Sequence, residues 1–407
     1  MNDIFIGRQP IYDRNLNVAA YELLYRDSFE NRANITDADL ASAQMIFTAI
    51  MDFGLDRLVG AHHAFVNLTR AVLLSEKLTA LPKDKVVLEV LETIDPDGPV
   101  VEAVTGLAEA GFQMALDDFF YDVSWEPLVQ RAHIIKVDVL GMTPDDIRGQ
   151  VTALKDFRGL LLAEKVEDQD CFQLCRELGF HYFQGHFFCR PKVIAGKRVP
   201  ANRLAVVQLL AALNDPDITV GALERLISQD VGLSYRLLRY INSAFFGLSR
   251  RIESIHHALV LLGLKSVKRW ATLISMSEVS DKPHELMVTA MVRAKMCELL
   301  AEAKRFPNAD VFFTVGLFSV LDALMDSPMA EILDALPITD ELRDALLAHA
   351  GAQGATLECV LAYEYGNWDK VIEIGLEPSV IRAAYLGAIA WVGDVESALR
   401  GDGAAED

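Results

Sequence analysis

Short apolar runs that end in polar residues recur through the first half of the chain. These runs are residues 4–12, residues 17–25, His63–Leu68, Val86–Leu91, Gln113–Leu116, Ile134–Val139, Leu160–Val166 and Tyr182–Phe188. Their length and composition predict buried strands. Helical patterns lie between several of them, as at Val100–Ala110 and Gln169–Leu178. Strands that alternate with helices in this way predict an α/β barrel of the TIM type.

The first two runs are joined by the polar segment Asp13–Leu16, which predicts an antiparallel hairpin at the start of the barrel. A helical stretch is expected near residues 39–53. The predicted fold class of the first half is therefore a TIM-like α/β barrel whose first strand is antiparallel.

The strand pattern stops near Arg190, and the second half of the chain is helical in pattern. The helical runs are Leu204–Leu213, Val220–Ser228, Leu233–Ile241, Ile255–Leu262 and Ser266–Ser275. Pro and Gly residues between the two patterns indicate a linker. We expect a barrel domain at residues 1–190, a linker at 191–200, an all-α domain at 201–400 and a disordered acidic tail at 401–407.

Net charge, the length of the apolar runs and the spacing of the cysteines indicate which partners and which cellular compartment to expect. The formal net charge of −20 argues against a general nucleic-acid or anionic-membrane surface, because phosphates are bound by clustered Lys and Arg. No apolar run reaches membrane-spanning length, and the start of the chain lacks the pattern of a signal peptide. The five cysteines lack paired spacing, which favours reduced thiols. We expect a cytoplasmic protein with no membrane or nucleic-acid partner.

Polar residues follow the ends of the predicted strands, most clearly where Gln113–Leu116 is followed by Asp117 and Asp118. The others are Glu22, Asn67, Glu89, Glu92, Lys136, Asp138, Glu164, Glu167 and Gln184. The carboxyl ends of barrel strands share one face, where such folds place their active sites. Each residue alone is more simply a polar end to a strand, but recurrence at successive strands favours a site.

The chemistry of these residues suits a hard divalent ion, because Mg²⁺ and Mn²⁺ prefer oxygen ligands. The oxygens of four strand ends could supply such ligands: Glu22, Asn67, Glu89 and Asp117. Two metal ions could clamp a phosphodiester and activate a water for in-line attack. Lys136 could stabilise developing negative charge, and Glu164 could orient the water or accept its proton.

The same residues carry a resemblance to a known family. The ordered segments are Gln9–Ile11, Tyr21–Arg26, Val66–Thr69, Leu88–Glu92, Ala115–Phe119, Ile135–Asp138, Ala163–Glu167 and Gln184–His186. Their series resembles the motifs of EAL domains, which are cyclic di-GMP phosphodiesterases with a TIM-like barrel. The resemblance covers about residues 1–190.

The resemblance implies roles for particular residues. It implies metal ligation by Glu22, Asn67, Glu89 and Asp117, with Asp118 and Asp138 at a second Mg²⁺ or Mn²⁺ ion. It gives Lys136 and Glu164 to the attacking water. Substrate contacts fall to Gln9, Arg26, Glu167 and Gln184, and Glu92 would brace the loop after Asp118. In the family that loop couples metal binding to dimerisation, so a homodimer is among the expected partners.

Five residues, in three motifs, depart from the family pattern. Leu23 stands where the name-giving motif has alanine, which leaves the ligand Glu22 in place. Phe120, Tyr121 and Asp122 replace the usual Gly-Thr-Gly, and bulky residues restrict the conformations that glycine allows. Lys165 replaces a usual glycine.

The second half resembles HDOD domains, which are helical relatives of HD-type phosphohydrolases. The segments that carry the resemblance are Ile227–Ser234, Leu237–Ser243 and Ile252–Gly263. A working HD site needs a His-Asp pair to hold metal, but Ser319 and Val320 stand at that position. We interpret this half as a non-catalytic module that contacts a protein partner.

Three functions remain open at this point. The first is a cyclic di-GMP signalling protein whose barrel binds the dinucleotide and hydrolyses it. The second is a catalytically inactive scaffold in which both halves mediate protein contacts. The third is a phosphodiesterase with another substrate.

Overall fold

The chain forms two compact units in a computed structural model that describes residues 5–26, 54–119, 122–185, 187, 201–215, 217–247, 252–277 and 282–400. One unit comprises Met1–Arg190 with Ala362–Arg382, and the other comprises Pro191–Leu361 with Ala383–Asp407. The helix expected near 39–53, the linker at 191–200 and the tail at 401–407 lie outside the described residues.

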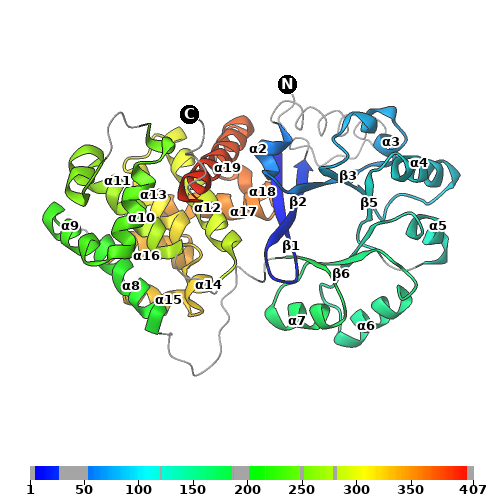
Figure 1. Ribbon diagram of the computed structural model, residues 1–407, viewed down its shortest axis with the longest axis horizontal. Coiled ribbons are helices and arrows are strands. Elements are labelled where there is room, and N and C mark those ends of the chain that lie inside the picture. Colours follow the sequence, from blue (N-terminus) through cyan, green and yellow to red (C-terminus); the bar gives the residue numbers. More distant parts are fainter. Residues whose placement is uncertain are drawn as a thin grey trace. The chain divides into compact units, whose positions relative to one another are not determined.

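The first unit is built on a closed eight-stranded barrel in which neighbours in sequence are neighbours in space (Figure 1). Its strands are β1 (Phe5–Tyr12), β2 (Val18–Arg26), β3 (His63–Leu68), β4 (Val86–Val90), β5 (Gln113–Leu116), β6 (Ile134–Asp138), β7 (Leu160–Glu164) and β8 (Tyr182–Gln184). Strand β1 runs antiparallel to both β2 and β8, and the other neighbours are parallel. The predicted barrel with an antiparallel first strand is confirmed.

The turn between β1 and β2 follows its sequence. Asp13 O accepts a hydrogen bond from Leu16 N at 3.1 Å, and the Asp13 side chain accepts one from Asn15 N at 2.8 Å. Short polar side chains that bond the following backbone are typical of turns. The predicted hairpin is confirmed.

Helices α2 (Leu55–Val59), α3 (Arg70–Leu73), α4 (Gly98–Glu109), α5 (Glu126–Val129), α6 (Pro144–Ala153) and α7 (Gln169–Glu177) follow the strands. Two short 3₁₀ turns, Glu76–Ala80 and Val123–Trp125, complete the connections. Side-chain caps begin the longer helices: Asp97, Thr143 and Asp168 each accept a hydrogen bond from the first helical turn. The predicted helices at Val100–Ala110 and Gln169–Leu178 are α4 and α7.

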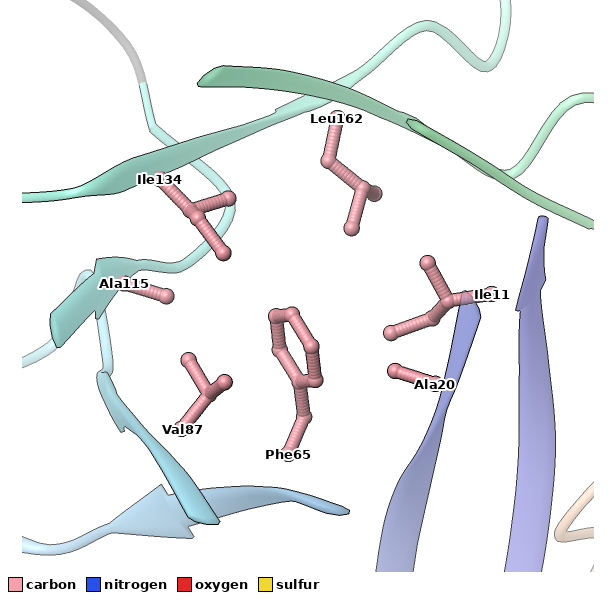
Figure 2. Close-up of a cluster of buried hydrophobic side chains, with 7 residues drawn as sticks. All are labelled: Ile11, Ala20, Phe65, Val87, Ala115, Ile134 and Leu162. Carbon is pink, nitrogen blue, oxygen red and sulfur yellow. The ribbon is translucent and has the colours of Figure 1, made fainter. Parts of the chain in front are cut away.

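One level of the barrel interior is filled with apolar side chains, as Figure 2 shows. We call this set the apolar layer: Ile11, Ala20, Phe65, Val87, Ala115, Ile134 and Leu162. Each is at most 3% exposed, and each comes from a different strand. Side chains that point inward from successive strands close a barrel into a packed core.

Side chains along a strand repeat with period two, so the next inward position lies two residues away. In β2 to β7 that step leads from the apolar layer to Glu22, Asn67, Glu89, Asp117, Lys136 and Glu164. In the reversed strand β1 it leads from Ile11 back to Gln9. With Gln184 of β8, these residues form a second level that we call the polar layer.

The second unit is helical throughout its described residues, apart from turns. Its helices are α8 (Ala201–Asn214), α9 (Val220–Gln229), α10 (Val231–Ile241), α11 (Ile255–Ser277), α12 (His284–Ala303), α13 (Ala309–Phe318), α14 (Leu321–Met325), α15 (Met329–Asp334), α16 (Asp340–Ala348) and α17 (Gly351–Glu364). A 3₁₀ turn spans Ala244–Phe246. Helix α18 (Trp368–Ile372) belongs to the first unit, and α19 (Pro378–Arg400) begins in the first unit and continues into the second. No helix among the described residues has the length and apolar character to span a membrane.

Two features organise this helical unit. The two helices expected at Ile255–Leu262 and Ser266–Ser275 are the two segments of α11, which are separated at Gly263, where a φ of 79° is not helical. Aromatic rings pack in its core: Trp270 lies 4.3 Å from Tyr240 and 5.7 Å from Trp391 between ring centroids. The predicted all-α second half is confirmed.

Candidate active site

Lys136 stands at the centre of the polar layer and is fully buried. Its Nζ lies 2.7 Å from Glu89 Oε1, 2.6 Å from Asp117 Oδ1 and 2.8 Å from Glu164 Oε1. Glu22 Oε2 is 3.4 Å away. These groups come from five parts of the barrel, β2, β4, β6 and β7 and the residue after β5, and the period of the strands places them all inside it. The structure thus brings together the carboxylates that the sequence singles out.

Amide side chains complete the layer on the side of β1, β2 and β8. Glu22 accepts hydrogen bonds from Asn67 Nδ2 at 2.8 Å and from Gln184 Nε2 at 2.7 Å. Gln184 Nε2 also lies 3.0 Å from Gln9 Oε1. Burial would raise the pKa of Glu22, but the charge of Lys136 and the two amide bonds lower it below its ordinary value. Glu22 is therefore held as a carboxylate.

The other carboxyls of the layer behave in the opposite way. Burial raises the pKa of Glu89 well above its ordinary value, raises that of Asp117, and raises that of Glu164 to about 8. Burial would lower the pKa of Lys136, but Glu22, Glu89, Glu164 and Asp117 together raise it well above the ordinary value. One ammonium faces four carboxyls, and proton uptake by the three carboxyls with raised pKa values relieves the excess negative charge.

A divalent cation would relieve the same excess. Asn67 Oδ1, Glu89 Oε2 and Glu164 Oε2 are buried and accept no hydrogen bond within the described residues. Buried oxygens without partners are costly, and oxygens are the ligands that Mg²⁺ and Mn²⁺ prefer. In the described part of the chain no three acidic, His or Cys side chains already surround a common point as metal ligands do. The donor set fits a divalent ion, and binding one entails rearrangement around Lys136.

A second cluster of charges lies at the rim, outside the polar layer. Lys165, which follows β7, contacts Asp118 Oδ1 and Oδ2 at 3.3 Å each and Asp138 Oδ2 at 2.5 Å. Burial would lower the pKa of Lys165, but the two aspartates raise it to about 12. The sequence marks Lys165 only as a replacement for glycine and misses this contact. The available signal for this contact was a basic residue directly after Glu164, when other strands of the same barrel end near Asp118 and Asp138.

The remaining predicted site residues are exposed or lie outside the described part of the chain. Glu92 and Glu167 are exposed in the turns after β4 and β7. Arg26 ends β2, and its side chain is outside what the structure describes. Phe120 and Tyr121, in the loop that Glu92 is expected to brace, are also outside.

In the helical unit, the position that the HDOD resemblance gives to a metal-binding pair holds different chemistry. Ser319 Oγ donates to Gly316 O at 2.7 Å and accepts from Arg293 Nη1 at 3.2 Å. Arg293 is 4% exposed, so a buried cation stands where a metal site would need carboxylate or imidazole. The non-catalytic interpretation of this half remains a prediction.

Both halves of the chain are similar to known proteins. Residues 199–332 match the HDOD domain family. The chain is 34% identical to the uncharacterized protein YuxH of Bacillus subtilis, over 95% of this chain and 98% of the relative. It is 32% identical to the cyclic di-GMP phosphodiesterase CdgJ of Vibrio cholerae, over 97% of this chain and 94% of the relative. Both relatives span the two units together.

Among solved structures, the FimX EAL domain of Pseudomonas aeruginosa bound to c-di-GMP is similar over 46% of this chain and 89% of its own length, with 18% identity and a TM-score of 0.36.

Proposed function

Because the chain belongs to the EAL–HDOD family, with CdgJ among its full-length relatives, we propose that its barrel binds cyclic di-GMP and hydrolyses it to the linear dinucleotide. The observation that carries the proposal is the polar layer. Oxygen donors from separate strands surround one buried lysine there, and several of the oxygens accept no hydrogen bond within the described residues.

In this proposal Glu22, Asn67, Glu89 and Asp117 hold an Mg²⁺ or Mn²⁺ ion. Such an ion, when bound, polarises a phosphoryl oxygen and lowers the pKa of a water. Glu22 suits the role of a metal ligand because the charge of Lys136 and the amides of Asn67 and Gln184 keep it ionised.

Two residues of the layer act on the attacking water. Without metal the pKa of Glu164 is raised to about 8, and its proton would be displaced on metal binding. The carboxylate then orients the water and accepts its proton. Lys136 stabilises negative charge that develops on the attacking and phosphoryl oxygens. Addition of the water breaks one P–O ester bond and leaves a terminal phosphate on a linear dinucleotide.

Groups around the mouth position the substrate. Gln9 and Gln184, joined by a 3.0 Å hydrogen bond, offer amide donors and acceptors beside Glu22. Arg26, at the end of β2, supplies the planar donor pair that suits a phosphate. Glu167 follows β7 on the same rim. These assignments rest on the resemblance of the motifs.

The HDOD domain passes the state of the barrel to a protein partner in this proposal. The barrel also forms a homodimer, as its resemblance implies. We place the protein in the cytoplasm, in keeping with the free thiols of Cys171, Cys175, Cys297 and Cys359.

A second candidate function is a binding scaffold without turnover. The observation that favours it is the contact of Lys165 with Asp118 and Asp138, the pair expected at a second metal ion. A scaffold would bind cyclic di-GMP or a protein partner and leave the dinucleotide intact.

Full-length protein incubated with cyclic di-GMP and Mn²⁺ separates the candidates. We expect linear dinucleotide to form, and Glu89→Gln to reduce its rate by at least about 100-fold because a metal contact is lost. Glu102→Gln, on the exposed side of α4, is the matched control and should keep the rate.

Binding without product in every variant would favour the scaffold. Absence of both binding and product would overturn the proposed hydrolysis and leave a scaffold for a protein partner. Cleavage of other cyclic dinucleotides alone would favour a phosphodiesterase with another substrate.

A further inference from the structure

Lys165 contacts three of the four carboxylate oxygens of the rim pair, Asp118 and Asp138. Both oxygens of Asp118 face Lys165 Nζ at 3.3 Å, and Asp138 Oδ2 faces it too. The remaining oxygen, Asp138 Oδ1, accepts the backbone N–H of Leu140 at 2.8 Å. A positive charge thus already lies between the two carboxylates.

The polar layer also holds an ammonium, that of Lys136, but it differs in the number of oxygens that remain without a hydrogen bond in the described part of the chain. Oxygens of Asn67, Glu89 and Glu164 lack hydrogen-bond partners there, within the described residues, whereas Asp118 and Asp138 have a partner for each oxygen. Hard divalent ions bind where several oxygens are available at once. The polar layer therefore keeps oxygens available beside the Lys136 ammonium, whereas Lys165 and the Leu140 N–H together occupy every carboxylate oxygen of the rim pair.

The backbone on both sides of this contact is in the left-handed region. Lys165 has a φ of 52° and Asp118 a φ of 41°, values that are unusual for residues other than glycine. A glycine at position 165 would adopt the same backbone more readily but would bring no charge. The lysine is thus held in a strained conformation in which its ammonium reaches two neighbouring strand ends.

We propose that Lys165 takes the place of a second metal ion: its ammonium, held between Asp118 and Asp138, supplies the second positive charge at the rim, so that each chain binds a single divalent ion. The inference rests on the proposed function, because the first ion belongs to the polar layer. It adds that Lys165 is a fixed cation of the site, present without metal.

Counting bound Mn²⁺ tests the inference without measuring activity. Full-length wild-type protein at saturating Mn²⁺ should bind one ion per chain by equilibrium dialysis. It should also show the electron paramagnetic resonance spectrum of an isolated ion. Lys165→Gly, which the backbone accommodates, should bind two ions per chain with the spectrum of a coupled pair. Lys165→Arg keeps the charge and should bind one.

The second ion of Lys165→Gly should be lost again when Asp138→Asn is added, because that change removes a carboxylate from the pair. Two ions in the wild type, or one ion in Lys165→Gly, would overturn the role of Lys165. No ion in any variant would instead overturn the metal-dependent function, so the two failures are distinguishable. Thermal melting of each variant establishes that it is folded.

Discussion

The two layers of the barrel interior are made by the same strands and differ by a shift of two residues. Phe65, Val87 and Leu162 close one level with apolar side chains. Asn67, Glu89 and Glu164, two positions further along, fill the next level with oxygens. The scaffold is identical at both levels, so the contrast in properties comes from the side chains alone.

The contrast separates stability from function. Burial of apolar side chains is the main favourable contribution to folding, at roughly 25 cal/mol per Å² of apolar surface. Buried charges rarely match it, because the cost of desolvation offsets their mutual attraction. The raised pKa values of Glu89, Asp117 and Glu164 are a direct sign of that cost. The apolar layer stabilises the barrel, and the polar layer is retained for chemistry.

The largest loss of stability is expected when a carboxylate like those of the polar layer is introduced into the apolar layer. Val87→Asp would bury a carboxylate with no cation beside it, at a position that is 1% exposed. We expect the free energy of unfolding to fall by more than about 4 kcal/mol, measured by urea denaturation. Val87→Ile, which keeps the chemistry, should cost less than about 1.5 kcal/mol. Equal losses in the two variants would contradict the account.

The next largest effect should come from removing the cation of the polar layer. Lys136→Met leaves four buried carboxyls without their ammonium, and we expect a loss of about 3–5 kcal/mol in the metal-free protein. Lys165→Met is the matched comparison. It breaks ion pairs of a side chain that is 48% exposed, which are worth about 1 kcal/mol or less. A similar small loss at both positions would show that burial does not set the cost.

A smaller effect is expected from pH. The pKa of Glu164 is raised to about 8, so between its unfolded value and pH 8 the folded protein holds a proton that the unfolded chain has lost. This contribution to stability is full at acid pH and is lost as the pH rises through about 8. Urea denaturation of the metal-free protein should therefore show a decline from pH 6 to 9, shallower in Glu164→Gln. If the free energy of unfolding of Glu164→Gln declined with pH as steeply as that of the wild type, Glu164 would be excluded as a source of the pH dependence.

The barrel strands and the residues at their ends could be predicted from the sequence, because inward-facing and outward-facing side chains alternate along each strand. Apolar runs with a polar residue at the end, such as the one before Asp117, define both the strands and the face on which their ends meet. The reversed first strand followed from the turn chemistry of Asp13. Boundaries were less exact: β7 ends at Glu164, because Lys165 leaves the extended region with a φ of 52°.

Distances between side chains from different strands could not be predicted, because they depend on the stagger of the closed barrel. The sequence places Lys136 at a strand end but does not indicate that four carboxyls meet its ammonium. It likewise does not join Lys165 to Asp118 and Asp138, since 47 and 27 residues separate them.

The measurement that tests the account most directly is the number of protons released when Mn²⁺ binds to the metal-free protein at pH 7. Protons balance the polar layer in the absence of metal, and a divalent ion replaces them. Calorimetric titration in buffers of different ionisation enthalpy should therefore show proton release, reduced in Glu164→Gln. Binding with no proton release, or no binding, would contradict the claim that the polar layer is a metal site.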